Sequence, residues 1–134
     1  MKLNIGDTAS RTKVITDTDI RTFADLTGDH NPIHMDDGFA SQSLFGRRIA
    51  HGMLNASLIS AVLANDLPGQ GSIYLGQTLQ FVAPVFIGDE ITARVTVTST
   101  RDDKPIAKLE TVCTNQRNEI VIKGEATVHY GNCR

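Results

Sequence analysis

The chain has little of what marks several common classes of protein. Its 134 residues carry 13 basic and 15 acidic side chains, a formal net charge of -2, so we expect no nucleic-acid partner and no polybasic membrane arm. Only two cysteines are present, Cys113 and Cys133, without C-x-x-C spacing. This count disfavours a disulfide framework and a zinc knuckle, so both thiols are expected to be reduced and structural.

Long apolar runs are also missing. The first ten residues, MKLNIGDTAS, contain no apolar segment of the signal-peptide type, and the most apolar later stretch is interrupted by Asn55, Ser57 and Ser60. The sequence therefore predicts a cytoplasmic protein with no membrane partner. A hydrophobic content of 40% suffices for one buried core at this length, so residues 1–134 are expected to form a single domain.

Helical signals dominate the first part of the chain. Thr16 and Asp19 stand three apart, as in a capping box, before apolar residues at helical spacing, and Gly28 supplies a stop. Pro32 lacks an amide hydrogen and clashes with a preceding helical turn. Residues 29–34 are therefore expected to be loop.

A second helix, from Gly52 to Asn65, is the most informative element. It ends before the Pro68-Gly69 pair, which breaks helices. Its apolar residues cover nearly the whole circumference, which predicts burial on most sides. A shorter helix is expected before it, at residues 37–43.

The pattern changes to period two from Gly71 to the end of the chain, which predicts an antiparallel meander. Turn residues at 87–89, 102–105 and 117–118 separate the strands, and one earlier strand is expected at 8–15. A buried helix followed by about four long strands favours an α+β fold in which the curved sheet wraps around the helix.

The residues best suited to chemistry gather around the proline turn. Because the turn folds the chain back, Asp29 and His34 can reach one water molecule and serve as a base and an acid, with Asn31 orienting the water. The structural alternative stays open. Under it, Asp29 caps a turn, Asn31 forms an Asx-turn before the proline, and His34 is a surface histidine.

A metal site is disfavoured by the same proline. His30 and His34 are four residues apart, with acidic residues close by. Such a pair converges on one metal ion only along a continuous helix, and Pro32 lies between the two. We therefore expect no metal.

One long run of residues resembles a known family signature. The run Phe23–His34, FADLTGDHNPIH, with Ala40 six residues on, resembles the signature of the hydratase 2 family, the MaoC-like (R)-specific enoyl-CoA hydratases. The resemblance continues through AHGM at 50–53, GSIYLGQ at 71–77 and PVFIGD at 84–89. It is closest to the short hydratases that supply polyhydroxyalkanoate synthesis. It implies a hot-dog fold, with a long helix inside a wrapped antiparallel sheet, and a homodimer with active sites near the subunit interface.

The resemblance also implies roles for particular residues. Asp29 and His34 fall on the catalytic aspartate and histidine and Asn31 on a supporting amide, for syn hydration of a trans-2-enoyl-CoA to a (3R)-3-hydroxyacyl-CoA. The amide of Gly52, at a helix start where unpaired N–H groups point outward, is the implied donor to the thioester oxygen. Coenzyme A is then part of the substrate, and no separate cofactor is expected. His51 receives no catalytic role, only capping or packing.

Five further residues are candidates for substrate binding. Ser60, Leu63 and Val128 fall where short-chain members of the family line the acyl pocket, although apolar residues there equally suit a core. Arg47 and Arg48 form a paired basic site expected near the pocket mouth, where they can meet the phosphates of coenzyme A. Adjacent arginines are equally common on a solvated surface.

Three other functions stay open, because one fold can host many activities. They are hydrolysis of acyl-CoA thioesters, dehydration of 3-hydroxyacyl groups on acyl carrier protein, and non-catalytic binding of acyl-CoA. The D-x-N-P-x-H arrangement favours hydration over thioester hydrolysis. It also counts against a binding module, because such a module has no need for an acid and a base beside the thioester.

Overall fold

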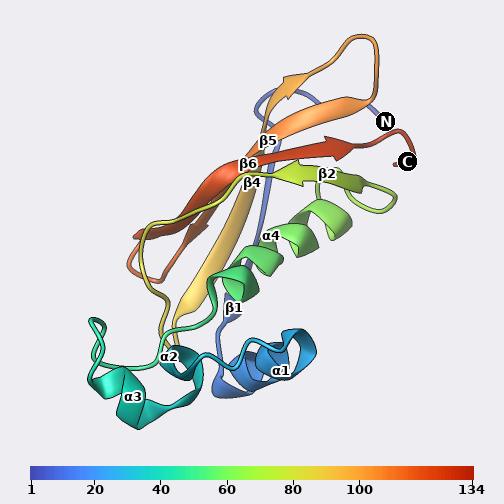
Figure 1. Ribbon diagram of the computed structural model, residues 1–134. Helices are drawn as coiled ribbons and strands as arrows, with labels where there is room; N and C mark the ends of the chain where they lie inside the picture. The colour runs from blue at the N-terminus through green and yellow to red at the C-terminus, as the bar shows by residue number, and fades with distance from the viewer.

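The computed structural model describes residues 1–134, and one antiparallel sheet and one long helix dominate it (Figure 1). The strands are β1 (Thr8–Val14), β2 (Ile73–Gln77), β3 (Gln80–Phe81), β4 (Glu90–Thr100), β5 (Ile106–Thr114) and β6 (Ile120–His129). The helices are α1 (Asp17–Thr27), α2 (Pro32–Met35), α3 (Asp37–Ser41) and α4 (Gly52–Asn65). The sheet order is β1-β4-β5-β6-β2, with β3 paired to β6.

The long strands β4, β5 and β6 form the expected meander, with the turns at 102–105 and 117–118 between them. The alternation in β4 buries one set of side chains: Ile91, Ala93, Val95 and Val97. The meander does not begin at Gly71, however, because β2 and β3 both pair with β6 and not with β4. Residues 82–89, which include Pro84, lie outside the named strands, consistent with the inability of proline to donate to a strand ladder.

Helix α4 has the predicted bounds and packs one face against the sheet. The residues buried on that face are Ala56, Ile59, Val62 and Leu63. The opposite face is exposed along the helix, at Met53, Ser57, Ser60 and Ala64. The expected burial on most sides is therefore wrong for the single chain, because the sheet covers only one side of α4 (Figure 1).

An antiparallel sheet curved along one long helix is the hot-dog arrangement of the α+β class, so the fold expected from the resemblance is confirmed. Side chains of α4 and of the strands form one core cluster of 20 buried residues. No helix in the structure has the length and hydropathy needed to cross a membrane.

Helices α1, α2 and α3 form a lobe at one end of the sheet (Figure 1). The predicted capping box is present, with Thr16 and Asp19 exchanging hydrogen bonds of 3.0 and 3.1 Å, and Gly28 ends α1 in the left-handed conformation. The expected loop at 29–34 is wrong in its second half, where α2 begins at Pro32. Proline is tolerated at the first position of a helix, because its missing amide hydrogen would have no acceptor there.

A joining segment, Arg48–His51, connects this lobe to the sheet. The amide of Ile49 donates to the carbonyl of Ile33 in the lobe (3.2 Å), and the amide of Ala50 donates to the carbonyl of Val85 beside the sheet (2.7 Å). The joining segment leads directly into α4. It therefore fixes the position of the lobe relative to the long helix.

Candidate active site

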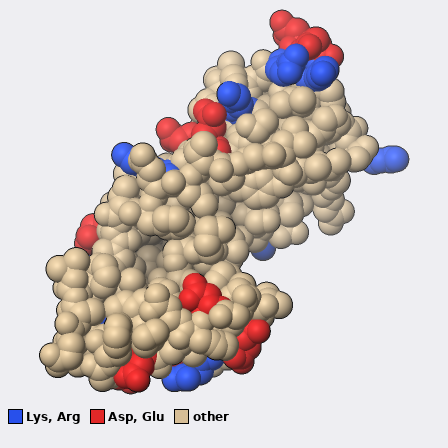
Figure 2. All heavy atoms as spheres, in the orientation of Figure 1, with Lys and Arg blue, Asp and Glu red and all other residues tan.

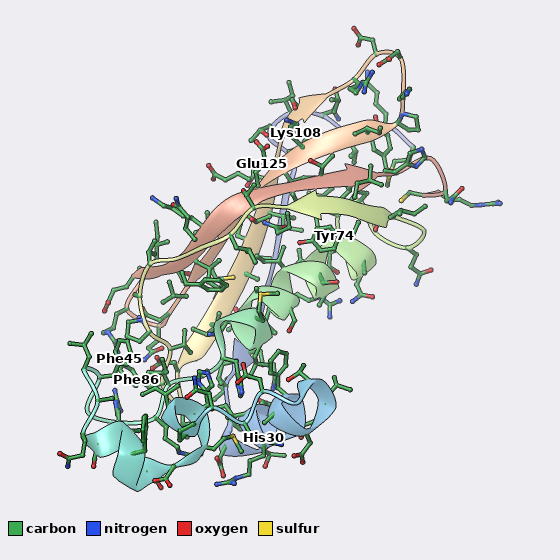
Figure 3. All side chains as sticks on the ribbon, in the orientation of Figure 1. His30, Phe45, Tyr74, Phe86, Lys108 and Glu125 are labelled. Atoms are coloured by element: carbon green, nitrogen blue, oxygen red, sulfur yellow. The ribbon has the colours of Figure 1, made fainter.

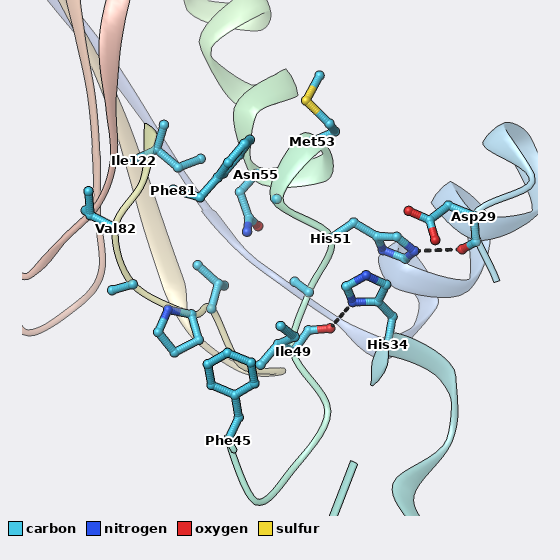
Figure 4. A pocket seen from close by; sticks show the side chains of 15 residues that line it. Asp29, His34, Phe45, Ile49, His51, Met53, Asn55, Phe81, Val82 and Ile122 are labelled. Atoms are coloured by element: carbon cyan, nitrogen blue, oxygen red, sulfur yellow. Dashed lines mark hydrogen bonds between the residues drawn. The ribbon is translucent and has the colours of Figure 1, made fainter. Parts of the chain in front are cut away.

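A cavity of about 430 Å³ lies where the lobe, the start of α4 and the segment after β3 meet. The titratable side chains of Asp29, His34 and His51 stand at one end, and the apolar side chains of Phe81, Val82 and Ile122 stand at the other (Figure 4). The cavity thus joins a small titratable cluster to an apolar wall, as sites for small molecules commonly do.

The structure brings Asp29 and His34 together, as the sequence predicts. A carboxylate oxygen of Asp29 and a ring nitrogen of His34 lie within 4.8 Å of each other. Asp29 is exposed on the loop after α1, where its Oδ1 accepts a hydrogen bond from the amide of Asn31 (3.3 Å). His34 is buried in α2 and approaches the cavity from the lobe.

The ring of His34 has a defined orientation. Its Nδ1 donates to the carbonyl oxygen of Ile49 (2.8 Å), because a carbonyl can only accept, so Nε2 of the neutral ring carries a free lone pair. Burial lowers the pKa of His34 from its ordinary value, and it outweighs the opposing effects of the Ile49 hydrogen bond and the Asp29 charge. His34 is therefore suited to accept a hydrogen bond or a proton at Nε2.

Asn31 influences the cavity only indirectly, through the helix that carries His34. Its Oδ1 accepts from the amide of Ile33 (3.1 Å) and caps α2, the helix that carries His34. Asn31 does not line the cavity. The geometry matches the Asx-turn alternative and gives Asn31 a part in starting α2.

His51 belongs to this site, although sequence reasoning assigned it only capping or packing. Its side chain makes no capping hydrogen bond; Nε2 donates to the main-chain carbonyl of Asp29 (3.0 Å). Its ring stacks on His34 with a centroid distance of 4.0 Å and lies 4.8 Å from the ring of Phe23. The only signal in the sequence is its position directly before Gly52.

The same three side chains are poorly arranged to bind a metal ion. Potential ligand atoms of Asp29, His34 and His51 lie within 4.8 Å of one another. The two imidazole planes, however, are stacked and only 30° apart, so their in-plane lone pairs run side by side and do not converge on one ion at bonding distances of about 2 Å. The arrangement fits proton transfer better than metal ligation.

Gly52 begins α4 and lines the cavity. Its amide donates to no acceptor in the chain, and it stands at the positive end of the helix. A Cβ atom at this position would lie 2.7 Å from two ring atoms of Phe81. A side chain here would displace the Phe81 ring, so glycine permits this close approach between the ring and the start of α4.

Asn55 is a second cavity residue that sequence reasoning did not identify. It is 3% exposed, its side chain makes no hydrogen bond within the chain, and its Oδ1 is fully buried (Figure 4). An unpaired buried amide costs about 1–3 kcal/mol. The signal was available, since Asn55 is an amide in the first turn of a helix whose residues are mostly apolar.

The three candidates for the acyl pocket do not line this cavity. Ser60 lies on the exposed face of α4. Leu63 and Val128 are buried in the core, with exposed fractions of 2% and 1%. The structure therefore does not support these three positions as walls of the cavity in the single chain.

The two adjacent arginines have different environments. Arg48 is buried, and its guanidinium donates to Asp17 (2.8 Å), Asp37 (2.9 Å) and the carbonyl of His34 (3.2 Å). The expected phosphate contact is therefore wrong for Arg48, because its donors are already engaged. Arg47 is exposed and lies 3.8 Å from the ring centroid of Phe86, which Figure 3 places near Phe45 at the edge of the lobe.

Comparison with known proteins agrees with this geometry. The MaoC-like domain family matches residues 5–119. The chain is 49% identical to an (R)-specific enoyl-CoA hydratase of Aeromonas caviae over 94% of both chains, and 50% identical to one of Rhodospirillum rubrum over 92% of this chain and 85% of that one.

A solved structure of the A. caviae (R)-hydratase, described as involved in PHA biosynthesis, superposes with a TM-score of 0.92 and covers 94% of this chain and 96% of that one. Sequence identity and backbone geometry thus agree over almost the whole length. The chain belongs to the MaoC-like family.

Proposed function

We propose that the protein is an enzyme that adds water to a trans-2-enoyl-CoA and forms a (3R)-3-hydroxyacyl-CoA. One observation carries the proposal. The carboxylate of Asp29 and a ring nitrogen of His34 lie within 4.8 Å of each other, in a cavity that the unpaired amide of Gly52 also lines. Two relatives of about half identity, named for this reaction, support the substrate class.

Asp29 and His34 would act together on the attacking water. The Asp29 carboxylate takes a proton from water while the oxygen bonds to C3, and Nε2 of His34 accepts a second hydrogen bond that fixes the direction of attack. The electron pair of the double bond moves towards the thioester carbonyl. A proton then passes to C2 from the same side, through His34 or directly from Asp29, and the enzyme returns to its starting state.

The negative charge that develops on the thioester oxygen needs a donor. The free amide of Gly52 lies at the positive end of α4, and Phe81 stands over it without offering a competing acceptor. One donor of this kind contributes about 10²- to 10³-fold to the rate.

The remaining substrate groups match the other walls. The apolar side chains of Phe81, Val82 and Ile122 suit an acyl chain, and Arg47 is an exposed cation available to a phosphate of coenzyme A. The reaction requires only water and the thioester, so no further cofactor enters this proposal.

A homodimer completes the proposal. The exposed face of α4 is flanked by β2, an edge strand whose Ile73, Tyr74 and Leu75 are 41–53% exposed. Figure 2 shows few charged side chains over α4 and β2, and Figure 3 shows Tyr74 extending from β2 towards α4. An apolar edge strand beside an exposed helix face without charged side chains suits isologous pairing with a second copy.

The proposed activity is tested by the loss of ultraviolet absorbance of crotonyl-CoA, followed by chiral analysis of the product. The wild type should give the 3R alcohol without free coenzyme A. Asp29→Asn should lower kcat about 10²- to 10⁴-fold, because the base is lost. Asp25→Asn is the matched control, since the Asp25 side chain is 81% exposed and outside the cavity.

Other outcomes would replace the proposal. Release of free thiol by the wild type would indicate thioester hydrolysis. Turnover on acyl carrier protein substrates alone would indicate the dehydratase. Binding of crotonyl-CoA without any conversion of enoyl-CoA substrates would indicate a binding module.

A further inference from the structure

We propose that His51 is a positioning residue that holds Asp29 at the distance from His34 that proton transfer requires. The inference rests on the proposed function. It starts from the loop that carries Asp29, and the experiment below separates its failure from failure of the hydratase assignment.

The loop at residues 28–31 is held mostly by hydrogen bonds to its own neighbours. The main-chain amide of Asp29 donates to the hydroxyl of Thr27, and the amide of Asn31 donates to Asp29 Oδ1. The one hydrogen bond that ties this loop to a distant part of the chain runs from His51 Nε2 to the Asp29 carbonyl, 22 residues apart in sequence. Removing it leaves the main chain at Asp29 without a tether to α4.

The His51 ring is itself firmly placed. It is 2% exposed and lies between the rings of Phe23 and His34. Its main-chain carbonyl accepts hydrogen bonds from the amides of Leu54 and Asn55 in the first turn of α4. The tether to Asp29 is therefore anchored in the long helix, and the same ring fixes one face of His34.

His51 does not itself carry protons to the substrate. Nε2 must bear the hydrogen, because its partner is a carbonyl that can only accept. Nδ1 is fully buried and has no partner. Nε2 is engaged and Nδ1 is enclosed by other atoms of the protein, so neither nitrogen can reach a reacting atom. The ring therefore acts through the positions of Asp29 and His34.

The hydrogen bond and the ring can be removed separately. His51→Phe keeps a flat ring against His34 but loses the donor, whereas His51→Gln keeps an N–H group that can reach the Asp29 carbonyl but loses the ring. A misplacement of about 1 Å can cost 10²-fold in rate. We expect His51→Phe to lower kcat about 10- to 100-fold with little change in KM, and His51→Gln to recover part of the loss.

A double variant tests whether His51 acts through Asp29. In an Asp29→Asn background, adding His51→Phe should cost little more, because a residue that positions the base has nothing left to position. A general structural role would instead multiply the two losses and raise KM. His30→Gln is the matched control, because this neighbouring imidazole is half-exposed and outside the cavity (Figure 3).

Amide hydrogen exchange gives a readout that does not depend on turnover. His51→Phe should accelerate exchange of the amides at 28–31, while His30→Gln and the wild type should agree. Unchanged exchange, an unchanged kcat, or multiplied losses in the double variant would each overturn the inference. If the wild type hydrates crotonyl-CoA and His51→Phe does so with the same kcat, only the inference fails. If the wild type has no hydratase activity, exchange still decides whether His51 tethers the loop.

Discussion

At the scale of single residues, His34 shows how one environment sets both the tautomer and the pKa of an imidazole. The Ile49 carbonyl fixes which ring nitrogen carries the proton, and burial makes the charged ring unfavourable. Asp29 favours the charged ring by its own charge, but the burial effect is larger and the pKa is lowered. The neutral ring, with its free Nε2, is therefore the resting form.

The lowered pKa of His34 predicts how the reaction rate changes towards acid pH. As pH falls through the lowered pKa of His34, Nε2 becomes protonated and can no longer accept, so the rate falls. We expect kcat/KM for crotonyl-CoA to decline towards acid pH with a midpoint below 6.5, the ordinary value of the group. A midpoint above pH 6.5, measured in rate profiles of the free enzyme, would mean that the charge of Asp29 outweighs burial.

Cavity residues were predictable where a local pattern marks them and not where a contact with a distant residue decides their place. Asp29, His34 and Gly52 carry a local pattern, and all three line the cavity. The part of His51 depends on the Asp29 carbonyl, far away in sequence. Arg48 was misjudged for the same reason, since nothing in an Arg-Arg pair reveals that two distant carboxylates meet one of its members.

At the scale of elements, Arg48 connects the helices of the lobe. Its guanidinium reaches Asp17 at the start of α1, Asp37 at the start of α3 and the carbonyl of His34 in α2. The planar fork of arginine suits several simultaneous acceptors, which a lysine ammonium cannot match in geometry. The lobe is thus held by one side chain of the joining segment as well as by its main chain.

Replacing Arg48 tests this connection. Arg48→Met should lower the free energy of unfolding by about 1–3 kcal/mol; the value is not larger, because the partner carboxylates are largely exposed and screened by water. Arg21→Met is the control, since Arg21 also pairs with Asp17 but on the surface, and it should cost less than about 1 kcal/mol. Urea unfolding measures both, and equal losses would contradict a special role for Arg48.

Element types followed from the sequence more closely than element boundaries and partners. Helix α4 and the β4–β6 meander matched their patterns, because periodicity and turn residues are local signals. Helix α2 was missed because Pro32 breaks a helix that begins before it but is compatible with a helix that begins at Pro32 itself. The cap formed by Asn31 makes the helix begin at Pro32. The pairing of β2 with β6 is a tertiary choice that alternation along one strand does not encode.

At the scale of the whole molecule, the apolar circumference of α4 has two explanations. The sheet accounts for one face, and the proposed partner copy accounts for the other. Hydrophobic periodicity does not distinguish burial within a chain from burial between chains, which is why the sequence predicted a helix covered on most sides. In the single chain, the prediction of burial fails only on the exposed face of α4.

The dimer is tested with charge placed on its proposed interface. The wild type should have twice the 14.5 kDa chain mass in light scattering after size exclusion, and Leu75→Lys on β2 should shift the mass towards one chain. Ile120→Lys is similar in exposure but lies at the start of β6, at the other end of that strand from the residues that pair with β2, and should remain dimeric. A monomeric wild type would remove this part of the proposal.

The joining segment also has a consequence for how a substrate can enter. Arg48, Ile49 and His51 form hydrogen bonds with the lobe, and Ala50 bonds to Val85 beside the sheet. The lobe therefore cannot move away without breaking these bonds together, as one cooperative unit. Opening by a hinge at this point is therefore costly. A substrate therefore has to enter with the lobe in place, along the cavity wall that belongs to the sheet side, where Phe81 of β3 is 52% exposed.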